Sequence, residues 1–202
     1  MQKTLLIIGI LVVTLFSTAC VNKFAVQELN NNAKALIAEG RVDDAIARLE
    51  SSIDLDEKVF ETHYNLAVVY IQAKKYDKAI KSLEKTIELN PDFADAYYSM
   101  GVVYEDKAVD IINGEVKDED GNLVNEDIEQ AVAEDSDAKK ELTDAEKTQI
   151  CDYITTAIDY YNKYLSKNSN ADDKDKVNEK IESLNKDLVK YSVESPSDVK
   201  VR

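Results

Sequence analysis

The sequence has few of the residue types from which catalytic and metal centres are built. Its 202 residues include one histidine, no tryptophan, five glycines and two cysteines. A cluster of histidine metal ligands is therefore excluded, and a Ser-His-Asp or Cys-His arrangement would have to use His63 alone. Five scattered glycines make no phosphate-binding loop. We therefore expect no enzyme activity and no cofactor.

Positive charge is also scarce. The chain has 40 acidic and 25 basic side chains, which give a formal net charge of −15. A field of this sign repels nucleic acid and anionic lipid surfaces. No nucleic-acid partner is expected.

The first twenty residues resemble a bacterial lipoprotein signal. Lys3 precedes an apolar run over residues 5–16, which is followed by Ser17, Thr18, Ala19 and Cys20. As a helix this run reaches about 18 Å, short of the roughly 30 Å of a bilayer core, so it indicates a secretory signal rather than a membrane span. An ordinary secretory signal with a chance cysteine near its end is the alternative interpretation.

The lipoprotein resemblance implies removal of residues 1–19 and acylation of Cys20, with residues 20–28 as lipid anchor and tether. It places the chain in the bacterial cell envelope. Val21 follows the cysteine where an aspartate is associated with inner-membrane retention, which favours the outer membrane, facing the periplasm. An acylated Cys20 is not available to Cys151, so no disulfide framework is expected.

A repeat of about 34 residues runs through the middle of the chain. Ala33, Ala67 and Gly101 share one register, and Ala45 and Ala79 share another. Together with Leu66, Tyr70, Leu83 and Pro91, these residues resemble the tetratricopeptide repeat (TPR). His63 replaces the tryptophan usual in the family and is expected to pack between helices.

This resemblance implies an all-α fold, a TPR-type right-handed α-solenoid of about three helical hairpins plus a C-terminal capping helix. The domain is expected over residues 29–191, followed by a disordered tail over residues 192–202. The last helix is expected from near Asn170 and carries an apolar edge from Val177 to Tyr191. A coiled-coil strand is the alternative for that helix, and the oligomeric state stays open.

An acidic insertion over about residues 114–142 splits the third repeat. Its first helix is expected from Ala94 to about Ile112. The sequence Thr143-x-x-Glu146 has the form of a capping box, which predicts the start of the second helix. In that helix Ala157 matches Ala79, and Tyr161 matches Leu83.

The insertion offers weak candidates for a metal site. Asp118, Asp120 and Asn122 supply oxygen ligands of the kind that calcium prefers. Their spacing does not fit an EF-hand, because placing Gly121 at the sixth position puts Val116 at the first. A solvated acidic segment is the simpler interpretation, and an envelope lipoprotein that binds calcium or another ligand through the insertion is the alternative function.

The remaining hypothesis is surface recognition, because solenoids of this kind present a concave groove built from the first helix of each hairpin. The resemblance assigns these groove positions to Asn30, Lys34, Ile37, Tyr64, Asn65, Val68, Ile71, Tyr98, Val102, Glu105 and Asp106. Tyrosines and aliphatic residues suit a protein or peptide partner. The function expected is a non-enzymatic adaptor or assembly scaffold that holds another envelope protein or peptide segment. In the competing interpretation Tyr64 and Tyr98 only shield the capping helix.

Overall fold

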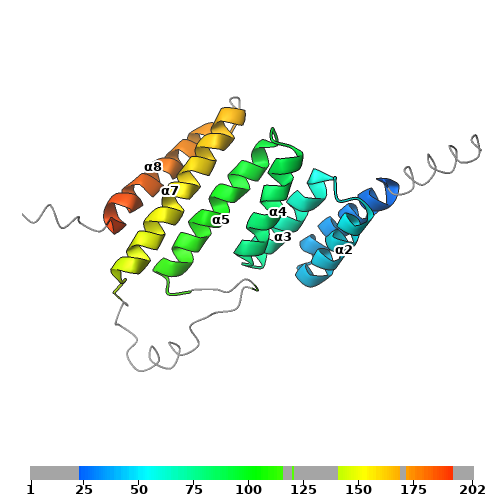
Figure 1. Cartoon of the computed structure of the whole chain (residues 1–202), viewed down its shortest axis with the longest axis horizontal. Helices are drawn as coiled ribbons and strands as arrows, with labels where there is room; N and C mark the ends of the chain where they lie inside the picture. Colours follow the sequence, from blue (N-terminus) through cyan, green and yellow to red (C-terminus); the bar gives the residue numbers. More distant parts are fainter. Residues whose placement is uncertain (1–22, 116–119, 121–140, 169–171, 193–202) are drawn as a thin grey trace, which may run out of the picture.

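The computed structural model describes residues 23–115, 120, 141–168 and 172–192. All regular structure in these ranges is helical. A helix over residues 23–38 precedes α2 (Val42–Leu55), α3 (Phe60–Gln72), α4 (Tyr76–Leu89), α5 (Ala94–Ile112), α7 (Asp144–Lys167) and α8 (Lys174–Tyr191). Figure 1 shows these helices lying side by side in chain order as antiparallel pairs. The expected all-α solenoid of three hairpins and a capping helix is confirmed.

The first helix of each hairpin ends at a residue in the left-handed backbone region. Gly40, Lys74 and Gly114 have φ values of 74°, 56° and 77°. This conformation turns the chain back so that a following amide bonds a carbonyl of the last helical turn. The three bonds are Arg41 N to Leu36 O (2.9 Å), Lys75 N to Tyr70 O (2.8 Å) and Glu115 N to Asp110 O (2.7 Å).

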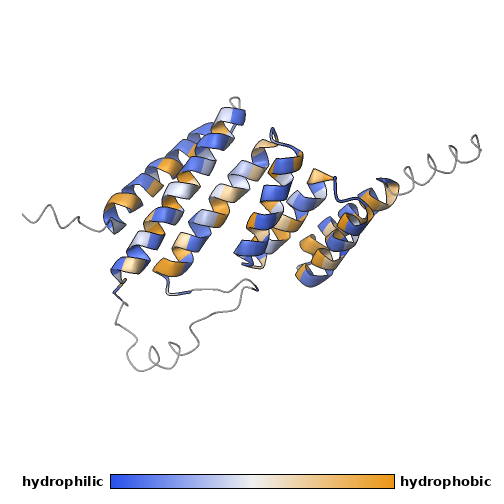
Figure 2. Cartoon of the chain, viewed as in Figure 1, coloured by the Kyte–Doolittle hydropathy of each residue, from blue (hydrophilic) through white to orange (hydrophobic). Residues whose placement is uncertain are grey.

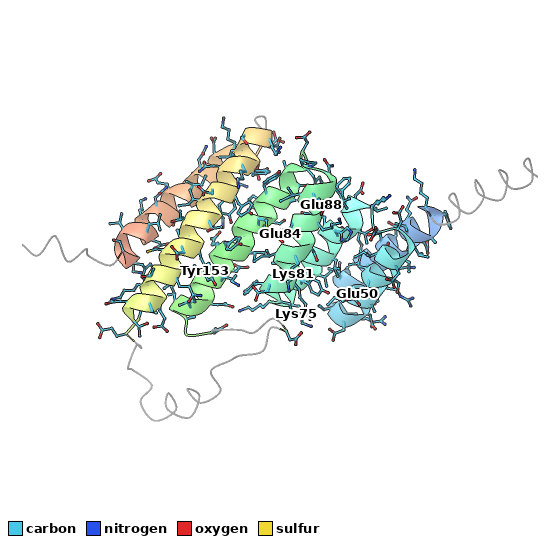
Figure 3. All side chains as sticks on the ribbon, viewed as in Figure 1. Glu50, Lys75, Lys81, Glu84, Glu88 and Tyr153 are labelled. Atoms are coloured by element: carbon cyan, nitrogen blue, oxygen red, sulfur yellow. The ribbon has the colours of Figure 1, made fainter. Side chains whose placement is uncertain are left out.

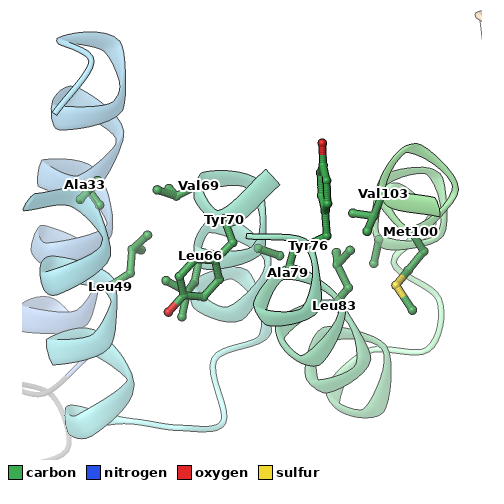
Figure 4. Packing of buried hydrophobic residues seen from close by; sticks show 13 residues of the cluster. Ala33, Leu49, Leu66, Val69, Tyr70, Tyr76, Ala79, Leu83, Met100 and Val103 are labelled. Carbon is green, nitrogen blue, oxygen red and sulfur yellow. The ribbon is translucent and has the colours of Figure 1, made fainter. Parts of the chain in front are cut away.

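Small residues let neighbouring helices pack closely. Ala33, Ala45 and Ala79 are fully buried in the cluster shown in Figure 4, which also contains Leu49 and Leu83. Figure 2 shows apolar residues alternating with polar ones along each helix, as expected when one face packs and the other is solvated.

In the third hairpin the small residue is a glycine, and a tyrosine fills the space that it leaves. A Cβ atom placed on Gly101 would lie 2.6 Å from the ring of Tyr161, far inside van der Waals contact. Tyr161 and Ala157 are both fully buried, which confirms their match to Leu83 and Ala79. The α5–α7 contact therefore replaces an Ala–Leu pairing by a Gly–Tyr pairing.

The third hairpin is also longer than the second. α5 has 19 residues against 13 in α3, and α7 has 24 against 14 in α4. Thr143 caps α7 as predicted: its Oγ1 accepts from the amide of Glu146 at 3.2 Å, and its own amide donates to the Glu146 carboxylate at 2.8 Å. Ala108 and Ile111 pack against Ile150 in the added length, so the split repeat is an elongated hairpin.

Two expected boundaries differ in the structure. Residues 23–28, assigned to the tether, are helical. α8 begins at Lys174 rather than near Asn170, with Asp173 as its N-cap residue.

α8 closes the array by packing on α7. Val177 and Leu184 are buried, and Ile181, Leu188 and Tyr191 pack around them. The apolar edge of α8 therefore packs within the chain, and α8 is a capping helix. Among the described helices, none combines the length and the apolar character needed to span a membrane. The expected signal, Cys20, most of the insertion and residues 193–202 lie outside the described residues.

We predict that Gly101→Ala destabilises the fold by about 1–3 kcal/mol, because the new methyl group overpacks the Tyr161 ring. The double change Gly101→Ala with Tyr161→Leu reproduces the pairing of the second hairpin. It is expected to be less destabilising than the sum of the two single changes. Urea unfolding of the four proteins measures this coupling, and strict additivity of the two changes would contradict the packing argument.

Candidate functional site

One side of the array is formed by the first helix of each hairpin and by α8. We call this surface, made by residues 23–38, α3, α5 and α8, the first-helix face; α2, α4 and α7 form the second-helix face. On α3, Tyr64, Val68 and Ile71 lie at successive turns and are half-buried. The ring of Tyr64 also meets the edge of Phe93, with centroids 4.9 Å apart. These three side chains form an apolar row on the predicted groove wall.

One predicted groove residue, Asn30, belongs to a buried polar network, and the half-buried Asn65 bonds to it. Asn30 is only 9% exposed, and its Nδ2 donates to Ser52 Oγ (3.0 Å) and Thr62 Oγ1 (2.8 Å). Its Oδ1 accepts from Asn65 Nδ2 at 2.9 Å. The assignment of Asn30 to the groove is therefore corrected: it joins the first hairpin to the second. Ser52 and Thr62 carried no sequence signal for this role.

The first helix contributes little else to the groove wall. Lys34 is exposed there, whereas Ile37 is half-buried and packs against the core cluster. On α5, Val102 is half-buried and packs against the cluster around α7. Ile37 and Val102 thus resemble Tyr64 and Ile71, which are also half-buried and pack against the core cluster.

Tyr98 is half-buried and packs against α7. Its ring lies between those of Tyr161 and Tyr164, with centroid distances of 5.4 and 5.3 Å. Both rings belong to α7 and not to the capping helix α8, so the competing interpretation, in which Tyr64 and Tyr98 only shield the capping helix, stays an alternative. Tyr64 contacts Phe93 and Ser99 and packs against the core cluster.

Glu105, another predicted groove residue, connects α5 to both following helices. Tyr161 donates its phenol to Glu105 Oε2 at 2.6 Å, and Lys180 Nζ lies 2.8 and 2.7 Å from the two carboxylate oxygens. The Lys180 ammonium also sits over the Tyr161 ring, 5.6 Å from its centroid. Burial, together with the adjacent Glu105 charge, raises the pKa of Tyr161 above the usual tyrosine value.

Asp106 is an acidic groove residue without an ion pair in the described chain. It is half-buried, and no described lysine or arginine lies within ion-pair distance of its carboxylate. Burial raises the pKa of Asp106 and the nearby carboxylates of Glu105 and Asp110 raise it further, whereas the more distant charges of Lys180 and Lys74 lower it. A cation from a partner would relieve this repulsion.

Each face also carries a cleft. On the first-helix face a cleft of about 400 Å³ lies between α5 and α8, lined by Val109, Leu184 and Asp187 among others. On the second-helix face a cleft of about 590 Å³ lies between α4 and α7, where Figure 3 shows Glu84 and Glu88 along α4.

Groups suited to metal or covalent chemistry are not assembled in the described residues. Of the three candidate calcium ligands, Asp118 and Asn122 lie outside these residues, and Asp120 forms an ion pair with Lys78 at 2.6 Å. No cluster of three or more His, Cys, Asp or Glu residues suited to a metal ion occurs in the described part of the chain.

His63 and Cys151, the residues of greatest chemical interest, have structural surroundings. The His63 ring is 8% exposed and hydrogen-bonds the carbonyl of Glu57 at 2.8 Å, which is a packing role. Burial and the neighbouring Asp152 raise the pKa of the Cys151 thiol, so it stays protonated and unreactive near neutral pH.

Stacked antiparallel helix pairs in one repeating register, closed by a capping helix, define an α-solenoid repeat protein. Residues 69–107 match the family model of the TPR repeat. The first TPR of Spaghetti (RPAP3) bound to the HSP90 peptide SRMEEVD is similar, with 15% identity and a TM-score of 0.52 over 81% of this chain and 93% of that one. The NMR structure of the first TPR domain of human RPAP3 is 14% identical, with a TM-score of 0.54 over 82% and 94%.

These comparisons, with the hairpin geometry, establish a TPR-type solenoid fold. No curated protein sequence matches the chain.

We predict that the fold weakens as the pH rises above about 10. Burial is the main cause of the raised pKa of Tyr76, Tyr161 and Tyr164, so these phenols ionise more readily in the unfolded chain. Their contribution is complete below the unfolded pKa of about 10 and is lost above it, by up to about 1.4 kcal/mol per pH unit for each buried group. Circular dichroism and tyrosinate absorbance should change together, and Tyr161→Phe should show a smaller alkaline loss of stability. Gradual ionisation of all tyrosines in a folded chain would contradict this.

Proposed function

We propose that the chain is a non-enzymatic adaptor that holds another protein or a peptide segment on its first-helix face. The observation that carries the proposal is the half-buried row of Tyr64, Val68 and Ile71 on α3, at whose end the repeat register places Asp106 of α5, a carboxylate without an ion pair in the described chain. An aromatic and aliphatic row beside a charged group is the composition of binding hot spots. A related fold carries a bound peptide in the RPAP3 complex, which supports the same use of the fold here.

The proposal includes the cell envelope as the place of action. Its support is the sequence of the first twenty residues, in which Lys3, an apolar run and Ser17-Thr18-Ala19-Cys20 follow the order of a lipoprotein signal. With its lipid on Cys20 and its first described helix at residue 23, the adaptor would hold its partner close to the membrane surface. The outer membrane, facing the periplasm, is the location proposed.

We predict that a photoreactive residue at Tyr64 captures one partner protein in living cells. The same residue at Lys81, exposed on α4 in the second-helix face, should capture none of it (Figure 3). Ile71→Asp should abolish the capture at Tyr64, because it places a charge in the apolar row. Mass spectrometry identifies the captured chain, and equal capture from Lys81 would show that the first-helix face is not the binding surface.

We predict that Cys20→Ser releases the protein from membranes and removes its labelling by a radioactive fatty acid, because the acylated thiol is the anchor. Cys151→Ser is the matched control and should leave both properties unchanged. Cell fractionation followed by immunoblotting measures the distribution. A Cys20→Ser protein that still sediments with membranes would contradict the proposed lipid anchor.

A further inference from the structure

The cleft between α5 and α8 lies mostly along the added turns of α5. α3 ends at Gln72, which corresponds to Asp106 in the repeat register, so the last turns of α5 extend beyond the neighbouring helix. α5 and α8 both pack on α7, and their backbones do not pack on each other. The space between them measures about 400 Å³.

The floor of this cleft is apolar and partly uncovered. Ala108, Ile154 and Leu184 line it from three different helices. Val109 lies at its edge with 44% of its surface exposed, an unusual exposure beside an otherwise buried cluster. An apolar side chain entering the cleft would bury this surface, which favours binding.

The lining of the cleft carries three carboxylates and two lysines, a small excess of negative charge. Glu179 and Asp187 of α8 contribute carboxylates to its lining, while the charge of Lys180 is already matched by Glu105. Lys176 is the other lysine of the lining. The cleft also runs toward the C-terminal ends of α5 and α8, where the helix dipoles add partial negative charge.

Asp106 adds a further carboxylate one helical turn from Val109, on the same side of α5. No described lysine or arginine lies within ion-pair distance of it, and Lys180 and Lys74 act on it only from farther away. This spacing places a site for a cation beside a site for an apolar group.

We propose that the α5–α8 cleft binds a partner segment in which an apolar side chain is adjacent to a lysine or arginine. The apolar side chain enters the cleft against Val109 and Leu184, and the cation lies at Asp106. This inference rests on the proposed adaptor function and specifies the chemistry of its partner. Charge complementarity supports a basic partner, since the chain has a net charge of −15 and the lining of the cleft has the same sign.

Two labelled peptides test the proposal by fluorescence anisotropy with the full chain. One alternates leucine and arginine, and the other has every arginine replaced by glutamate. The first should bind with an affinity that falls as salt rises, and the second should not bind. Equal binding of both peptides would overturn the proposal.

Asp106→Asn should weaken binding of the leucine–arginine peptide about five- to tenfold, and Asp159→Asn on α7 is its matched control. Asp106→Asn also removes a repelled carboxylate, so its melting temperature should be equal to or above that of the parent chain at neutral pH. Weaker binding by a chain of undiminished stability separates lost recognition from lost folding. Unchanged affinity would overturn the role of Asp106.

Val109→Asn should weaken the same peptide by a similar factor, and Val189→Asn, at the 78% exposed valine of α8, should leave affinity unchanged. Equal effects of the two valine changes would overturn the role of the cleft.

Tighter peptide binding after removal of residues 193–202 would assign the cleft to the chain's own Val199-Lys200-Val201-Arg202 segment and overturn an external partner. Failure of the peptide tests with capture retained at Tyr64 contradicts this inference alone, whereas failure at both sites also contradicts the adaptor function.

Discussion

Contact between a small residue on one helix and a large residue on the next is the constraint on which the array depends. In the second hairpin the repeat register pairs Ala67 with Leu83, and both are fully buried. In the third it pairs Gly101 with Tyr161, whose ring occupies the space where a Cβ would lie. That close approach also brings the phenol of Tyr161 to Glu105, and Glu105 in turn holds Lys180 of the capping helix. One packing contact thus positions the end of the first-helix face.

Most of the fold could be predicted from the sequence, because equivalent positions of a repeat lie in the same structural environment several times along the chain. The period identified Ala157 and Tyr161 as the continuation of the third repeat across the insertion, and both are fully buried. Thr143 and Glu146 predicted the start of α7 correctly, because a capping box is a purely local interaction. The start of α8 was placed too early, since acidic residues near an N-terminus do not show which of them begins the helix.

The functional face was predicted less well, because the repeat register assigns a position on a helix and not the neighbour that covers it. Asn30 occupies a groove position but meets Ser52 and Thr62, two residues whose spacing carries no signature of that contact. Tyr98 and Glu105 are taken up by α7 and α8, which pack against the last repeat of so short an array. The row of Tyr64, Val68 and Ile71 lies on α3, in the middle hairpin of the array, as predicted.

The elongated third hairpin has a consequence for which insertions and deletions the sequence can tolerate. Its added turns extend α5 to Ile112, and the capping box of α7 fixes where the helical register resumes. Because the closure entropy of a connection grows by only about 0.6 kcal/mol for each doubling of its length, a longer or shorter chain between Gly114 and Thr143 carries little penalty. The connection between Gly114 and Thr143 is accordingly a position where a reporter or a foreign domain can be inserted while the solenoid stays intact.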